Sequence, residues 1–235
     1  MSEKHQDVGK LAARTDELAH EYGDLVGIVP YAGEVVAAYR FVRQRRVRSF
    51  LRGLGGATAG FCATDNERFR AYINSLPGRE LLAEFAEASL RSRTQTATAA
   101  LALLYADFEN RRFSAQFKSD AVAALEGLTD RSVEAFLLLS NHASMLFETP
   151  DQGPFKVVAV TGSIVAAAKE LSAWSTEASA WVGVVTDLIQ RGLLATDWAA
   201  GSRQGGEDWM VYFAFSSVSS DMKTLLGNAL ATLAA

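Results

Sequence analysis

The sequence predicts a mainly helical protein, with a helical N-terminal region and a C-terminal region that carries one β-hairpin. Over most of the chain, apolar residues recur at three- and four-residue steps, which places them on one face of successive helices. Between Leu193 and Phe215, two runs rich in apolar and aromatic residues instead flank the glycine-rich segment 201–206. That arrangement is typical of a hairpin. We expect a helical region over residues 1–128 and a second region over residues 129–235.

Composition limits the class of protein. The chain has 235 residues, a formal net charge of −4 and one cysteine, Cys62. A single cysteine excludes an internal disulfide framework and fits a reducing compartment. The first ten residues lack the apolar core of a signal peptide, so we expect a cytoplasmic protein. The negative charge argues against broad affinity for nucleic acid, although a local basic patch is compatible with it.

An apolar run over residues 25–42, Leu25 to Val42, raises the question of membrane insertion. A membrane-spanning helix needs about 20 predominantly apolar residues. Pro30 and Glu34 lie near the middle of this run, which favours a buried helix–turn–helix element. A membrane-active effector that uses Leu25–Val42 remains an alternative.

The apolar run leads into a helix crowded with arginines, which we expect to end at the glycines that begin with Gly53. One interpretation is that the arginines bury their stems and pair with acids such as Glu80, Glu84 and Glu87. The other is a patch that contacts phosphates or an anionic surface. The candidate contacts are Arg40, Arg43, Arg45, Arg46, Arg48 and Arg52.

Four further helical segments are expected between residues 64 and 144. A capping box at residues 64–67 starts the first, and Pro77-Gly78 stops it. Residues 79–110 form a long helical stretch, in which the β-branched threonines of residues 92–98 favour a break. Shorter helices are expected at residues 119–126 and after the cap residue Thr129.

We find no constellation that predicts catalysis. The segment from Lys156 to Leu171 has the strand, Thr161-Gly162 and helix order of a short-chain dehydrogenase opening. It lacks the further glycines that let a backbone approach a pyrophosphate, so we expect it to be helical. The three histidines and Cys62 lack metal-ligand spacing, and the nearby Ser140, His142 and Ser144 lack an orienting acid. We predict no enzyme, no catalytic residue, no metal and no cofactor.

The segment 176–215 has the most ordered set of local signals. Apolar residues place one face of a helix toward the core, namely Ala178, Trp181, Val182, Val185, Leu188 and Ile189. Gly192 ends that helix, and the expected strands cover residues 193–199 and 208–215. A closing helix follows, with Ser219 or Ser220 as its cap.

This order of helix, RGLL, glycine-tipped hairpin and return helix resembles the end of a winged-helix domain. Residues 132–144 and part of residues 155–172 would supply the earlier helices. The resemblance implies a helix that docks into DNA and a wing that contacts it, for which the candidates are Trp198, Arg203 and Gln204. The outward side of the helix instead carries Glu177 and Asp187, which a phosphate backbone would repel. We therefore expect a protein partner or self-association.

The N-terminal stretch GIVPYAGEVVAAYRFVRQRRVRSFLRGL is similar to the helical segment of bacterial proteins of the abortive-infection alpha type. That resemblance implies a prokaryotic accessory or phage-defence role and assigns no catalytic residues. The sequence as a whole predicts a non-enzymatic protein-interaction or regulatory module, with no small-molecule substrate. The alternatives are nucleic-acid binding through Arg40–Arg52 and membrane activity through Leu25–Val42.

Overall fold

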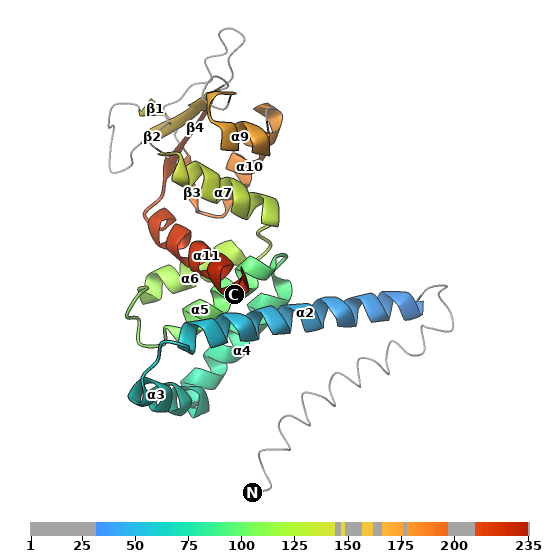
Figure 1. The fold of residues 1–235 in the computed structure, drawn as a ribbon, viewed down its shortest axis with the longest axis vertical. Helices are drawn as coiled ribbons and strands as arrows, with labels where there is room; N and C mark the ends of the chain where they lie inside the picture. Colours follow the sequence, from blue (N-terminus) through green and yellow to red (C-terminus); the bar gives the residue numbers. More distant parts are fainter. Residues whose placement is uncertain are drawn as a thin grey trace, which may run out of the picture. The chain divides into compact units, whose positions relative to one another are not determined.

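The computed structural model describes residues 32–143, 147–148, 157–161, 166–175, 178–196 and 210–234 (Figure 1). The chain divides into two compact units, residues 1–45 and residues 46–235. Helix α2 (Ala32–Thr58) crosses this division, so its residues 46–58 belong to the second unit. The predicted division between residues 128 and 129 is a different one and stays a prediction.

The prediction of a mainly helical protein with a C-terminal hairpin is confirmed. After α2, the helices are α3 (Ala63–Asn74), α4 (Leu76–Arg91), α5 (Gln95–Ala106), α6 (Ala115–Leu125), α7 (Asp130–Asn141), α9 (Lys169–Trp174), α10 (Ala178–Gln190) and α11 (Ser219–Ala234). The strands are β1 (Phe147–Glu148), β2 (Val157–Thr161), β3 (Leu194–Thr196) and β4 (Met210–Phe215).

The expected end of α2 at its glycines is wrong, because the helix continues through Gly53, Gly55 and Gly56 to Thr58. A Cβ atom on Gly53 would lie 2.7 Å from the carbonyl oxygen of Ala99 on α5. The missing side chain thus lets α2 pack directly on α5. This close packing offsets the weak helix propensity of glycine, which local sequence alone does not reveal.

The caps of α3 and α4 also differ from those expected. The N-cap of α3 is Cys62, and the Asp65 carboxylate accepts hydrogen bonds from its backbone N–H at 3.3 Å and from its thiol at 3.0 Å. The expected capping box at residues 64–67 is therefore displaced by two residues. The Ser75 hydroxyl caps α4 by accepting from the Gly78 N–H at 3.1 Å. Pro77 occupies the first turn of α4, where its missing N–H is not needed.

The predicted break in the long helical stretch is confirmed and falls at residues 92–94. The Thr94 hydroxyl caps α5 by accepting from the Ala97 N–H at 2.9 Å. Nearly all of α5 is buried, and its residues are mostly alanine, leucine and threonine. Small side chains allow neighbouring helices to approach α5 closely, which makes it the central helix of the second unit. Both α4 and α11 pack against it.

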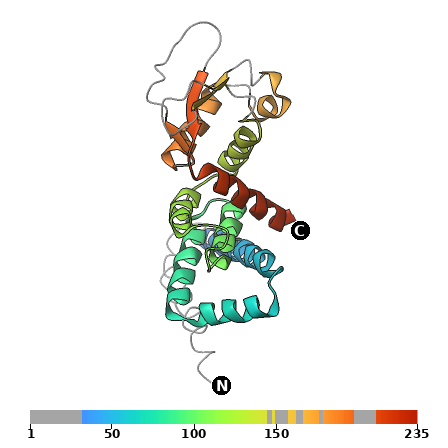
Figure 2. The ribbon, with the colours of Figure 1, turned by 90° about the vertical axis from the view of Figure 1, so that its left-hand side faces the viewer.

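The predicted hairpin belongs to a four-stranded sheet with the order β1-β2-β4-β3, and every neighbouring pair of strands is antiparallel. Figure 2 shows the strands gathered together, with the chain leading from β4 into α11. The expectation of a helix over residues 156–171 is wrong for β2. Val157 of this strand pairs with Ala214 of β4, and Thr161 pairs with Met210. The run of β-branched residues in β2 suits a strand, and the partner strand lies about 50 residues further along the chain. Antiparallel pairing also differs from the parallel sheet of a dinucleotide-binding fold.

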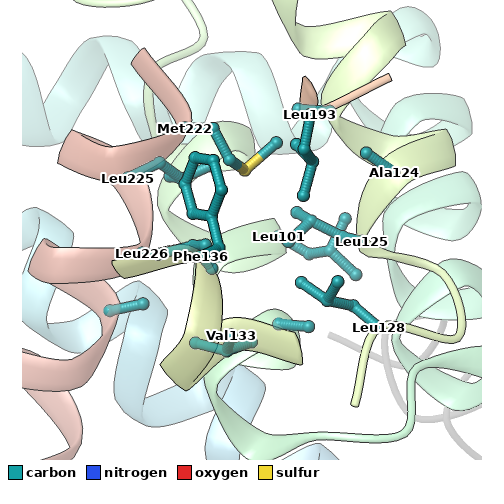
Figure 3. Close-up of a cluster of buried hydrophobic side chains, with 14 of the residues drawn as sticks. Leu101, Ala124, Leu125, Leu128, Val133, Phe136, Leu193, Met222, Leu225 and Leu226 are labelled. Atoms are coloured by element: carbon teal, nitrogen blue, oxygen red, sulfur yellow. The ribbon is translucent and has the colours of Figure 1, made fainter. Parts of the chain in front are cut away.

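The apolar core joins the sheet region to the helices around α5. Figure 3 shows Leu101 of α5, Phe136 of α7 and Leu193 before β3 converging with side chains of α6 and α11. Phe136, Leu101 and Leu193 are fully buried. Helix α11 packs on both α5 and α7 and so covers one side of the core. This core fixes the position of α7, against which α10 packs.

Candidate functional site

Helix α10 is held in place by two tryptophans at its base. Trp181 is fully buried, and its indole N–H donates to the carbonyl oxygen of Ser175 at 2.8 Å. The ring centroids of Trp174 and Trp181 are 4.4 Å apart, and the Arg131 guanidinium lies 4.7 Å from the centroid of the Trp174 ring. Aromatic and cation–π contacts of this kind stabilise the packing of α9 and α10 on α7.

The outward face of α10 is uncharged among the described exposed side chains. Its members are Val182, Gly183, Thr186 and Gln190, and Val182 is 48% exposed. The prediction that Val182 belongs to the core is wrong, and Val184 is buried in its place. Trp181, Val184, Val185 and Leu188 follow the i, i+3, i+4, i+7 spacing of one buried stripe, which leaves Val182 to one side. We call Val182, Gly183, Thr186 and Gln190 the α10 face.

Asp187 does not present a free charge beside this face. Its carboxylate accepts a hydrogen bond from the Ser132 hydroxyl at 2.8 Å. It also forms an ion pair with Arg191, whose Nε lies 2.9 Å away. Arg191 also donates through Nη1 to the carbonyl oxygen of Glu126 at 2.6 Å. Asp187 is therefore a structural link between α10, α7 and the end of α6. Glu177, the other acid expected here, lies outside the described residues, as do the wing candidates Trp198, Arg203 and Gln204.

The predicted basic residues all lie on α2. Arg40, Arg43 and Arg45 belong to the first unit, and the side chain of Arg40 lies outside the described part of the chain. Arg46, Arg48 and Arg52 belong to the second unit, in which Arg48 and Arg52 are exposed.

The acids expected to pair with the arginines of α2 are Glu80, Glu84 and Glu87, and all three lie on α4. Arg46 donates to a backbone carbonyl, that of Leu90 at the end of α4. Glu87 lies 3.4 Å from Arg91, which in turn pairs with Glu126 at 2.7 Å. Glu80 and Glu84 are exposed on α4 and form no ion pair with another described residue. Arg46 therefore contacts α4 through a backbone carbonyl and not through one of these carboxylates.

The loop after α5 carries a partly buried ion pair between Asp107 and Lys118 that the local sequence pattern does not predict. Asp107 accepts from the backbone N–H groups of Arg111 and Arg112 at 3.1 Å and of Phe113 at 3.0 Å. Lys118 Nζ lies 3.2 Å from the same carboxylate, and the two side chains are 11% and 8% exposed, respectively. Burial lowers the pKa of Lys118, and Asp107 opposes that shift. The sequence of this loop, DFENRRFS, gives only a weak signal for such a turn, namely Asp107 and, three positions later, Asn110.

A second set of ion pairs joins this loop to α3. Arg111 pairs with Asp65 at 3.2 Å and with Glu109, and Arg68 pairs with Glu109 at 3.3 Å. The hydrogen bond from the Cys62 thiol holds the pKa of Asp65 below its usual value. Burial opposes this shift, and the charge of Arg111 lowers the pKa by a smaller amount. These charges border a cavity of about 180 Å³ that is also lined by phenylalanines. The carboxylates at the cavity are satisfied within the protein, which indicates a structural role.

The described residues contain no cluster of three or more histidine, cysteine, aspartate or glutamate side chains that would hold a metal ion. Within the same part of the chain, no helix has the length and apolar character required to cross a bilayer. The chain matches no family model, no curated protein and no solved structure.

Proposed function

We propose that this protein is a non-enzymatic interaction module whose α10 face contacts another protein. The observation that carries the proposal is the uncharged outward surface of α10, in which Val182 is 48% exposed. The cores of protein–protein interfaces are depleted in charged residues, and a DNA-reading helix needs arginine, lysine, asparagine or glutamine directed at the bases. Gln190 alone among Val182, Gly183, Thr186 and Gln190 has such a side chain.

The strand and helix order supports a winged-helix assignment for the region that presents this face. Helix α7, strands β1 and β2, helices α9 and α10, and the β3–β4 hairpin follow one another in the chain, with β4 between β2 and β3 in the sheet. In a winged helix, the helix before the hairpin is the one that docks into a partner. We infer that α10 has this role, on fold-level analogy. A prokaryotic phage-defence role is a further proposal that rests on the sequence resemblance of the N-terminal helix.

Nucleic-acid binding through α2 is the second candidate, because Arg48 and Arg52 are exposed one helical turn apart. Basic side chains that contact phosphates make binding strongly dependent on salt. The net charge of −4 limits this function to a local patch.

Affinity capture with a charge-bearing variant tests the proposal. Val182→Glu/Thr186→Glu places two carboxylates on the α10 face, whereas Ser119→Glu/Ala123→Glu adds the same charge at two exposed positions of α6 with the same spacing. The wild type and Ser119→Glu/Ala123→Glu should retain a protein partner after nuclease treatment, as identified by mass spectrometry. The Val182→Glu/Thr186→Glu variant should lose it while keeping the far-ultraviolet circular dichroism of the wild type. Recovery of nucleic acid alone would contradict the proposal.

A further inference from the structure

The outward face of α2 within the second unit is divided into an apolar edge and a basic edge. Val47 and Leu51 are 48% and 58% exposed, and Arg48 and Arg52 are exposed beside them. Successive residues of a helix point about 100° apart, so Leu51 and Arg48 lie on adjacent parts of one face. The opposite side of the helix carries the buried Phe50.

The basic edge borders a groove between α2 and the last turns of α11. Arg52 and Gly56 line one side of it, and Ala231, Thr232, Leu233 and Ala234 line the other, around a volume of about 810 Å³. Except for Arg52 and Thr232, the lining side chains are apolar or absent. Small residues at a helix surface allow the backbone of another helix to approach closely.

The positive charges beside this groove are not neutralised by described residues. Arg48 and Arg52 form no ion pair with another described residue. The arginines and lysine of the second unit that do so are Arg68, Arg91, Arg111, Lys118 and Arg191. An occupant that is acidic along one side would complement these two arginines. Exposed leucine and valine next to them require that the same occupant also have an apolar side.

We propose that the outward face of α2 and the adjoining groove bind an acidic amphipathic helix of a partner protein. The two apolar residues are four positions apart, as are the two arginines, which is slightly more than one helical turn, or about 6 Å along the helix axis. A partner helix with leucine and glutamate repeated at the same interval matches both edges at once. This inference rests on the proposed function, since it names a partner class for an interaction module, but it uses a surface other than the α10 face.

A pair of designed peptides with reversed charge tests the inference. The acidic probe is a fluorescein-labelled, 18-residue amphipathic helix of leucine, alanine and glutamate, and the basic probe has lysine at every glutamate position. Fluorescence anisotropy measures the binding of each probe to the full chain. Arg48→Glu/Arg52→Glu is the test variant. Arg70→Glu/Arg79→Glu, at exposed positions of α3 and α4, is the control of equal charge.

We expect the acidic probe to bind the wild type and the control variant, and to bind the Arg48→Glu/Arg52→Glu variant at least about tenfold more weakly. The basic probe should show the reverse preference. Leu51→Ser should weaken binding of the acidic probe without reversing its charge preference, since it changes only the apolar edge. Equal binding of the acidic probe to the wild type and the test variant, or no binding at all, overturns the inference.

Other occupants give different results. Binding of duplex DNA or of phosphatidylserine vesicles that is lost in Arg48→Glu/Arg52→Glu, without binding of the acidic probe, assigns the face to a polyanion or a membrane and overturns the inference. A molecular mass in sedimentation that rises with protein concentration in the wild type but not in Leu51→Ser assigns the face to a second copy of the chain and also overturns the inference. In each case the Val182→Glu/Thr186→Glu experiment still tests the proposed function separately.

Discussion

Replacement of Asp107 tests whether one buried carboxylate holds the loop after α5. This carboxylate accepts three backbone hydrogen bonds and lies 3.2 Å from Lys118 Nζ. Asp107→Ala leaves the Lys118 ammonium without its acid in a position where its side chain is 11% exposed. Breaking a buried pair from one side costs about 3–5 kcal/mol. We expect the free energy of unfolding to fall by about 3 kcal/mol, at the lower end of this range, because Lys118 is partly buried and keeps its hydrogen bond to the carbonyl oxygen of residue 107. Water would replace the bonds to the exposed Arg111 and Arg112.

The Lys118→Met variant should be much milder, because Asp107 retains its three N–H donors. We expect a loss of about 1 kcal/mol, comparable to one ordinary hydrogen bond. In the double variant, the unpaired ammonium is absent, so its loss should be smaller than the sum of the single losses by about 2 kcal/mol. Urea unfolding followed by circular dichroism measures all three variants.

The matched control is Asp120→Ala, which removes an exposed carboxylate bonded to Gln116 at 3.0 Å on α6. Its cost should stay within about 0.5 kcal/mol, as for most surface changes. If the losses for Asp107→Ala and Lys118→Met add to within about 0.5 kcal/mol in the double variant, the two side chains are not coupled and the reasoning is refuted.

Three further predictions concern the core and the helices around it. Phe136→Ala should lower the free energy of unfolding by about 3–5 kcal/mol, because Phe136 is fully buried. Leu76→Ala changes a position that is 71% exposed and should lower it by less than about 0.5 kcal/mol. Similar losses for the two variants would contradict the assigned core. Gly53→Ala should destabilise the protein by about 1–3 kcal/mol, because the new Cβ would lie 2.7 Å from a backbone oxygen of α5. Gly55→Ala should stabilise it by about 0.5–1 kcal/mol, because no atom lies within 4 Å of the new Cβ. Thermal unfolding that ranks the two variants in the opposite order would contradict the packing of α2 on α5. Burial, with a smaller contribution from a neighbouring tyrosine, raises the pKa of Tyr105 from 10.0 to about 12, so the folded state keeps this proton longer than the unfolded state. The contribution of Tyr105 to the free energy of unfolding should be fully present below about pH 10 and should be lost as the pH rises toward 12. Urea unfolding of the wild type and of Tyr105→Phe over this pH range measures this contribution. An equal loss of stability in both proteins would refute the assignment.

Much of the helical architecture is predictable because its signals are local. Thr129 caps α7 as expected, and the break before α5 falls within the threonine-rich segment that was expected to weaken the helix. The errors arise where distant contacts decide. Gly53 remains helical because it packs on α5, and residues 157–161 form a strand because β4 provides a partner. Neither partner is visible within a short window of sequence.

The candidate surfaces show the same division between local and distant information. Arg48 and Arg52 are exposed, but their exposure does not identify what α2 contacts. The acidic character assigned to α10 depended partly on Asp187, which the structure pairs with Ser132 and Arg191. Ser132 lies 55 positions away in the chain, so helical periodicity could not reveal that this charge was already satisfied.

The pair of tryptophans that packs at α10 would allow ligand binding at this helix to be followed by spectroscopy. Trp174 and Trp181 have centroids 4.4 Å apart, and Val182 follows directly after the buried indole of Trp181. A ligand that shifts α10 against α7 would change the spacing of these rings and their distance from the Arg131 guanidinium. Their near-ultraviolet circular dichroism and emission wavelength would then report occupancy without any label, in a protein with four tryptophans in total.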